Sequence, residues 1–129
     1  LILLIMTTCV NLIGCKNFKK VFTRPNPDIV VKDFFNSLIK KDYVRAYSFL
    51  CEENKKLTTI EEFVETIKNF QEIKEYEILS SNVGYKNARI LVDLKSISYD
   101  EEETTKIEVP LVMQEDIWRI VFYDIEFEK

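Results

Sequence analysis

The stretch ARILVDLK, residues 88–95, alternates apolar side chains with mostly polar ones. Successive side chains of a β-strand point to opposite faces, so this period of two predicts a strand with one buried face. The stretch KIEVPLVM, residues 106–113, repeats the alternation. Between the two lies the acidic run 100–103, which we interpret as a charged hairpin turn. The expected buried residues are Ala88, Ile90, Val92, Leu94, Ile107, Val109, Leu111 and Met113.

Two further strands are expected on either side of this pair. Ile73, Tyr76 and Ile78 mark a strand that ends near Asn82, with Gly84 in the next turn. Residues 114–116 form another turn, and a last long strand follows with Trp118, Ile120 and Phe122 on its inner face. The sequence therefore predicts four antiparallel strands joined by short turns.

Three helices are expected before the strands, each with a start signal. Asn26 followed by Pro27 and Asp28 opens the first, which ends near Lys40. Asp42 caps the second, and Thr59 with Glu62 forms a capping box for the third. Their apolar residues recur at helical spacing, and the predicted fold class is α+β, with three N-terminal helices on one face of the sheet.

The N-terminal segment resembles the end of a lipoprotein signal peptide. Residues 1–14 are uncharged and mostly apolar, and Leu12-Ile13-Gly14-Cys15 looks like a bacterial lipobox. The segment is shorter than the roughly 17–25 residues of a membrane-spanning helix. We interpret residues 1–14 as a signal peptide that lacks its basic beginning, and Cys15 as the lipidated residue on the extracytoplasmic face of a bacterial membrane. A buried strand that ends in Gly-Cys is the alternative.

Charge divides the mature chain into two parts. Residues 15–26 hold four basic residues and no acid, so we interpret them as a basic tether, which anionic headgroups attract by about 1 kcal/mol per charge. Residues 27–129 form one domain with a net charge of −8, which disfavours nucleic acid as a partner. Cys9 leaves with the signal and Cys15 is blocked by lipid, so Cys51 has no disulfide partner.

Several short motifs accompany this order of elements: Asp33-Phe34-Phe35, Lys41-Asp42-Tyr43, Ala46-Tyr47-Ser48, Leu50, Thr59-Ile60-Glu61-Glu62-Phe63 and Trp118-Arg119-Ile120. Together with the order, they resemble the nuclear-transport-factor-like (cystatin-like cone) superfamily. The likeness covers about residues 27–123, and within the superfamily it is greatest to small bacterial lipoproteins of unknown function sometimes labelled lumazine-binding-like. It implies a strongly bent sheet with a conical pocket, and a homodimer through the outer sheet face, where Leu91, Val112, Val121 and Tyr123 could serve.

Catalysis is not expected, although relatives in this superfamily include isomerases and cyclases. The chain has no histidine, and the parity of Asp93 and Glu108 places both carboxylates on the outer face. Cys51 has no histidine partner, and the acidic run lacks the ligand spacing of a calcium loop. We therefore expect no metal and no cofactor.

The sequence favours a noncatalytic domain that binds a small molecule or another protein, with a small-molecule isomerase or cyclase as the alternative. Any pocket should lie between the helices and the inner sheet face. We predict six residues near it, whose alternative role is ordinary core packing: Phe34, Tyr47, Phe63, Val92, Val109 and Trp118.

Overall fold

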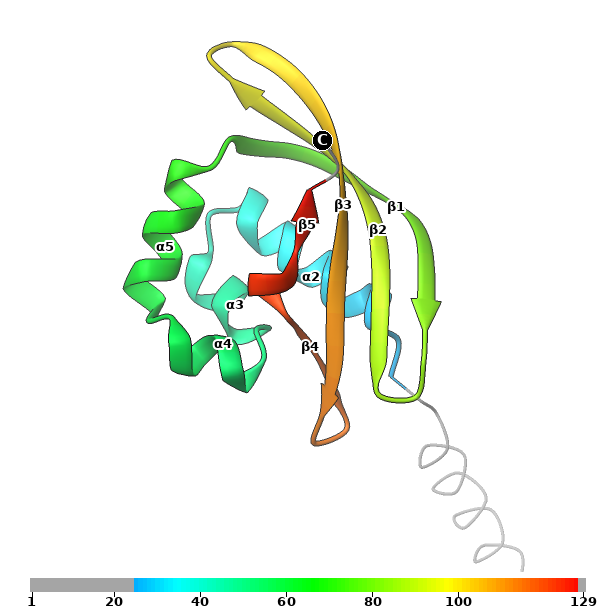
Figure 1. Cartoon of the computed structure of the whole chain (residues 1–129). Helices are drawn as coiled ribbons and strands as arrows, with labels where there is room; N and C mark the ends of the chain where they lie inside the picture. The colour runs from blue at the N-terminus through cyan, green and yellow to red at the C-terminus, as the bar shows by residue number, and fades with distance from the viewer. Residues whose placement is uncertain (1–24, 128–129) are drawn as a thin grey trace, which may run out of the picture.

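The computed structural model describes residues 25–127, with no account of the side chains of Glu126 and Phe127. The predicted signal peptide and Cys15 lie outside this range. The elements, labelled as in Figure 1, are α2 (Pro27–Ile39), α3 (Tyr43–Ser48), α4 (Glu52–Leu57), α5 (Ile60–Asn69), β1 (Glu72–Val83), β2 (Asn87–Ser98), β3 (Glu101–Gln114), β4 (Ile117–Ile120), the 3₁₀ helix η1 (Phe122–Asp124) and β5 (Glu126–Phe127).

The three predicted helix starts are confirmed by their capping hydrogen bonds. The Asn26 side chain accepts from the backbone N–H of Asp28 at 2.9 Å, and the Asp42 carboxylate accepts from that of Arg45 at 3.2 Å. The Thr59 hydroxyl accepts from the N–H of Glu62 at 3.2 Å. Each cap satisfies a backbone donor that the first turn of a helix leaves without a partner.

A fourth helix, α4, was not predicted. Its N-cap residue, Cys51, forms no capping side-chain hydrogen bond, and its six residues show no apolar period. Asn54 anchors it instead, because this side chain is 2% exposed and its Oδ1 accepts from the backbone N–H of Phe122 at 2.8 Å. A contact between distant parts of the chain therefore holds α4.

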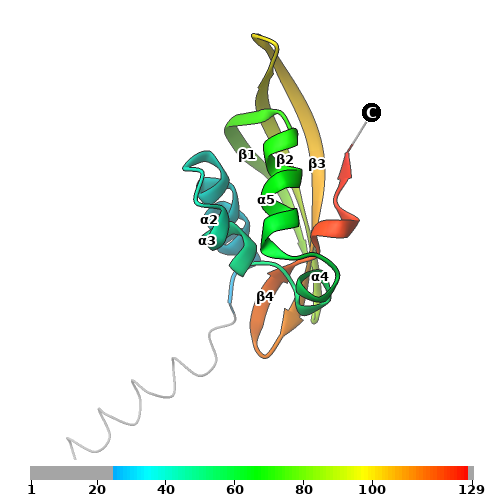
Figure 2. The same cartoon turned by 90° about the vertical axis from the view of Figure 1, so that its left-hand side faces the viewer.

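The sheet is antiparallel in the order β1-β2-β3-β4, and β5 pairs with β3. Two hairpins turn through pairs of left-handed residues, Tyr99-Asp100 and Glu115-Asp116, which is the backbone of the two-residue turns that suit twisted strands. The acidic run is therefore not a turn throughout, since Glu101–Glu103 already pair with β2. Figure 2 shows a curved sheet with the helices on its concave side.

The predicted long last strand is wrong, because β4 ends at Ile120. The N–H of Phe122 donates to Asn54, so the chain turns into η1 before β5 pairs with β3 at Ile107 and Glu108. Val121 and Tyr123, expected on the outer sheet face, consequently lie beyond the strand.

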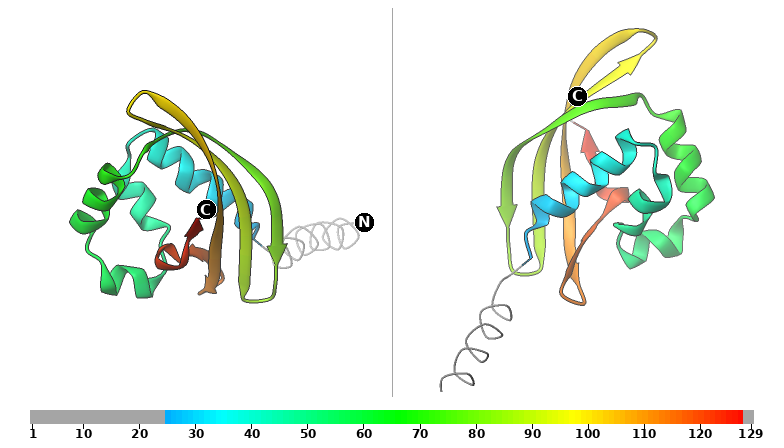
Figure 3. Two further views of the ribbon diagram at one scale, coloured as in Figure 1. Left: turned by 45° about the horizontal axis from the view of Figure 1, so that its top comes forward. Right: turned by 180° about the vertical axis from the view of Figure 1, so that it is seen from behind.

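Helix α2 packs across the concave face of the sheet, as the right view of Figure 3 shows, and carries much of the core. It contacts β1, β4 and β2. The inner residues of β2, β3 and β4 follow the predicted alternation. Residues at most 3% exposed include Val31, Phe34, Phe35, Phe63, Ala88, Ile90, Val92, Ile107, Val109, Leu111, Trp118 and Ile120.

The described chain begins at one end of the sheet. The indole N–H of Trp118 donates to the carbonyl of Pro25 at 3.0 Å, and the hydroxyl of Ser81 donates to Asp28 at 2.6 Å. The β1–β2 and β3–β4 turns lie at this end, joined by the N–H of Met113 and the carbonyl of Lys86 at 2.8 Å. The β2–β3 turn, with Tyr99 at its tip, lies at the opposite end (Figure 1).

None of the helices within residues 25–127 combines the length and the apolar character needed to cross a bilayer.

Candidate ligand cavity

A cavity of about 800 Å³ lies at the end of the sheet away from Pro25. It is bordered by the last turns of α2 and α5, the beginning of β1, and the parts of β2 and β3 nearest their shared turn. Lys41, which has a left-handed φ of 61°, lies in the turn between α2 and α3 and lines the cavity.

The inner sheet face has two halves along β2. In the filled half, Ala88, Ile90 and Val92 pack in the core with residues that include Val109, Leu111, Trp118 and Ile120. In the open half, Leu94 and Ser96 border the cavity together with Ile73, Thr105 and Ile107. The alternation is continuous between the halves, so the boundary is set by what the helices cover.

Apolar side chains form most of the cavity wall. They come from α2, α5, the sheet and the segment around η1, and Phe34 stacks edge-on against Phe35 with ring centres 5.3 Å apart. The ring centres of Phe122 and Phe34 are 6.4 Å apart, so the start of η1 forms one side of the cavity. Phe70, at the end of α5, is 49% exposed beside the opening.

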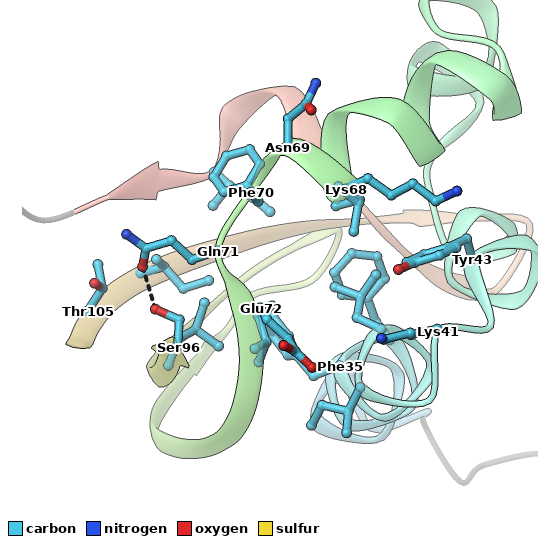
Figure 4. Close-up of a pocket in the computed structure, with 18 of the residues that line it drawn as sticks. Phe35, Lys41, Tyr43, Lys68, Asn69, Phe70, Gln71, Glu72, Ser96 and Thr105 are labelled. Atoms are coloured by element: carbon cyan, nitrogen blue, oxygen red, sulfur yellow. Dashed lines mark hydrogen bonds between the residues drawn. The ribbon is translucent and has the colours of Figure 1, made fainter. Parts of the chain in front are cut away.

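Three polar residues on one side of the cavity form a hydrogen-bonded chain, which we call the glutamine bridge. The hydroxyl of Ser96 donates to Oε1 of Gln71 at 2.5 Å, as Figure 4 shows. Nε2 of Gln71 donates to the carboxylate of Glu103 at 3.1 Å. The bridge links Gln71, just before β1, to β2 and β3. Its two hydrogen bonds engage the Ser96 hydroxyl, both ends of the Gln71 amide and one oxygen of the Glu103 carboxylate.

Three hydrogen-bond donors, Lys41, Tyr43 and Lys68, lie on the opposite side of the cavity (Figure 4). We call them the donor cluster. Within residues 25–127 neither ammonium forms a salt bridge, and the Tyr43 hydroxyl forms no hydrogen bond with another group. Glu72 lies near Lys41, but its carboxylate accepts from Lys74 at 3.1 Å. That hydrogen bond, with the charges of Lys74 and Lys41, lowers the pKa of Glu72.

Of the six residues predicted near a pocket, only Phe34 lines the cavity. Phe63, Val92, Val109 and Trp118 are at most 1% exposed in the core, and the hydroxyl of Tyr47 donates to the carbonyl of Thr58 at 2.7 Å. None of these five residues lines the cavity: four belong to the core, and Tyr47 is half-buried against it. The predicted region, between helices and inner face, does contain the cavity.

Glu103 is a cavity residue that the sequence reasoning missed. Counting back in twos from Ile107 through Thr105 leads to Glu103, so the parity of β3 already places it on the inner face. Treating the acidic run as a turn concealed this. The pattern gave no comparable signal for Gln71 or Lys41, which lie between elements.

The charged residues of the outer face lie where their parity predicted. Glu108 pairs with Arg89 at 2.7 Å, and Asp93 lies opposite Lys106 in the strand register. Of the residues expected on this face, Leu91 and Val112 are on it and half-buried. No group of three metal-ligating side chains occurs in the described part of the chain.

Cys51 is buried at the beginning of α4, as its N-cap residue. Its thiol donates to Oδ1 of Asn54 at 3.2 Å, and burial raises the pKa of the thiol. A raised pKa reduces the thiolate fraction, and the thiolate is the reactive form. Cys51 therefore acts as a packing residue.

Neither a protein-family model nor a curated protein sequence matches this chain. Solved structures do match it. A SEC-C motif-containing protein from Rhodopseudomonas palustris is 12% identical over 73% of this chain and 70% of its own, with a TM-score of 0.60. An NTF2-like protein of unknown function from Cytophaga hutchinsonii is 11% identical over 83% and 94%, with a TM-score of 0.54.

A "putative NTF2-like transpeptidase" from Campylobacter jejuni is 17% identical over 75% of this chain and 98% of its own, with a TM-score of 0.53. At such identities the likeness is one of fold. It agrees with the four helices and the curved antiparallel sheet described above. The chain therefore has the NTF2-like α+β fold.

Proposed function

We propose that this protein is a lipid-anchored, extracytoplasmic bacterial lipoprotein whose domain binds a small molecule in the cavity without catalysis. The observation that carries the binding role is the cavity itself. Its volume of about 800 Å³ falls within the roughly 300–1,000 Å³ of small-molecule sites, and a mainly apolar wall with a few polar groups is typical of them.

The apolar wall indicates what part of a ligand the cavity would hold. Phe35, Ile73 and Leu94 line the cavity from three elements, α2, β1 and β2, and water there cannot replace the contacts that packed side chains would make. An apolar group would gain roughly 25 cal/mol for each Å² it removes from water. We therefore propose a ligand with a substantial apolar body.

Binding is testable with N-phenylnaphthylamine, an uncharged probe whose fluorescence rises in apolar surroundings. Ile73→Gln places an amide in the cavity wall and should weaken probe binding about tenfold, the effect of roughly 1.4 kcal/mol. Leu79→Gln is the matched control, since Leu79 is on the same strand, is 39% exposed and does not line the cavity. Equal affinities for both variants would show that the probe binds elsewhere.

The anchor is supported by Leu12-Ile13-Gly14-Cys15, which also underlies the finer likeness to lumazine-binding-like lipoproteins. A diacylglycerol on Cys15 supplies two acyl chains, which anchor a protein stably where one chain does not. In bacteria that express the full chain, Cys15→Ser should move the protein out of the membrane fraction and abolish labelling with palmitate. Cys51→Ser, the other cysteine of the mature chain, should do neither. Labelled, membrane-bound Cys15→Ser protein would contradict the anchor.

Glu103 supports an isomerase- or cyclase-like enzyme as a second candidate, because it places a carboxylate in the cavity. A carboxylate that moves a proton at a ligand carbon would exchange deuterium from D₂O into the ligand. Mass spectrometry of a ligand recovered from the protein after incubation in D₂O tests this candidate. Deuterium uptake that disappears in Glu103→Gln would favour the enzyme. The hydrogen bond from Gln71 to Glu103 instead favours a structural role for the carboxylate.

A further inference from the structure

We infer that the cavity selects an acidic ligand, a carboxylate joined to an apolar body, and that the carboxylate binds at the donor cluster of Lys41, Tyr43 and Lys68. This inference rests on the proposed binding function and names its ligand class. It follows from an asymmetry between the two polar sides of the cavity.

The glutamine bridge has little hydrogen-bonding capacity left for a ligand. Oε1 of Gln71 accepts from Ser96, and Nε2 donates to Glu103, so both ends of the amide are already engaged. The bridge also presents a negative charge, which would repel an acid. An anionic group is therefore disfavoured on this side.

The donor cluster has the opposite character. Two ammonium groups and one phenol offer donors, and within the described residues none of them has a salt-bridge or hydrogen-bond partner. Glu72 contributes a nearby negative charge, but it accepts its hydrogen bond from Lys74. Lys41 therefore interacts with Glu72 through its charge alone, and within the described residues its ammonium forms no salt bridge.

A carboxylate matches these donors chemically. It accepts several hydrogen bonds at once, and those from an ammonium are about twice as strong as bonds between neutral groups. Two lysines and two glutamates, Glu72 and Glu103, line the cavity, and both lysines belong to the donor cluster. The wall formed by Phe35, Ile73 and Leu94 would then accommodate the apolar body.

Three ligands that share one chain, decanoate, decanol and decylamine, separate the head-group preference from apolar binding. The affinity of each can be measured by displacement of N-phenylnaphthylamine from the purified full-length protein. Decanoate should bind about tenfold tighter than decanol, because hydrogen bonds to charged groups contribute about 1.5–3 kcal/mol. Decylamine should bind most weakly, since the lysines repel it.

Removing the two cavity lysines should remove this preference. In Lys41→Met with Lys68→Met, decanoate should fall to the affinity of decanol, while decanol should change by less than about twofold because its apolar contacts remain. The matched control is Lys86→Met with Lys106→Met, which removes the same charge from exposed lysines outside the cavity. This control should keep the preference for the acid.

The outcomes distinguish the inference from the function on which it rests. If decanol binds as tightly as decanoate, or if both double variants lose the preference equally, the donor cluster does not select acids, although the cavity still binds ligands. If none of the three ligands displaces the probe, the binding function fails as well. Tyr43→Phe should weaken decanoate about threefold and leave decanol unchanged, as expected for one neutral hydrogen bond.

Discussion

The filled and open halves of the inner sheet face share one strand, β2, and one alternation. The filled half contains Ala88, Ile90 and Val92, and the open half contains Leu94 and Ser96. The filled half packs with α2 and β4, whereas the open half borders a cavity of about 800 Å³. The strand pattern thus specifies which side chains face inward, while the helices decide which of those are covered. The filled half should therefore set the stability of the domain, and the open half its binding.

The largest expected effect is in the filled half. Trp118→Ala removes a side chain that is 1% exposed and also removes the hydrogen bond to the Pro25 carbonyl. Truncating such a buried aromatic should lower the free energy of unfolding in urea by about 3–5 kcal/mol. Tyr99→Ala, at the fully exposed hairpin tip, is the control and should change it by less than about 0.5 kcal/mol. Similar losses for the two variants would contradict the role of the filled half.

The 3₁₀ helix η1, which begins at Phe122 beside the cavity, depends on Asn54. Asn54→Ala leaves the N–H of Phe122 without its acceptor and should cost about 1–3 kcal/mol, the usual penalty for an unsatisfied buried group. Hydrogen exchange of the Phe122 amide should accelerate more than that of Val109, in the central part of the sheet. If both amides accelerate equally, η1 does not open separately and Asn54 stabilises the domain only as a whole.

Placing an isoleucine in each half of the inner sheet face compares how tightly the two halves are packed. Ala88→Ile inserts methyl groups where Ala88 is 3% exposed, so overpacking should cost about 1–3 kcal/mol. Thr105→Ile extends into the cavity, so its unfolding free energy should change by less than about 0.5 kcal/mol while probe affinity falls. Equal destabilisation by the two substitutions would mean that the open half is as tightly filled as the other.

The smallest expected effect concerns Cys51, which packs under α4. Burial raises the pKa of its thiol above the ordinary value of about 8.5, so its contribution to stability is complete below that pH. The contribution is lost as the pH rises through the raised pKa of the folded state. Between about pH 8 and pH 10 the unfolding free energy of the wild type should fall more steeply than that of Cys51→Ala. Parallel curves would show that the thiol ionises equally in both states. Tyr76, whose pKa is also raised, contributes equally to both proteins.

Local signals were sufficient to predict most of the fold. Asn26, Asp42 and Thr59 marked helix starts because a cap needs only neighbouring residues, and the alternation around Ile90 and Val109 identified a paired inner face. The features that failed depend on distant contacts. Phe122 continues the period of two, but its N–H donates to the side chain of Asn54 instead of to a neighbouring strand, and the strand ends before it.

The cavity could not be predicted residue by residue for a related reason. Val92 and Leu94 are both buried, apolar, inward-facing residues of one strand, yet only Leu94 also borders the cavity, which the alternation alone does not specify. Glu103 was accessible to sequence reasoning through its parity with Ile107, but the turn was placed a few residues too late.

The hydrogen bond between the indole of Trp118 and the carbonyl of Pro25 bears on the side from which a ligand would enter the cavity. It places the first described residue at the end of the sheet opposite the cavity, whereas Lys68 and Phe70, exposed beside the opening, lie at the other end. If the chain is held to a bilayer through Cys15, the point of attachment and the cavity opening belong to opposite ends of the described domain. A ligand would then enter the cavity at the end that is farther from Pro25.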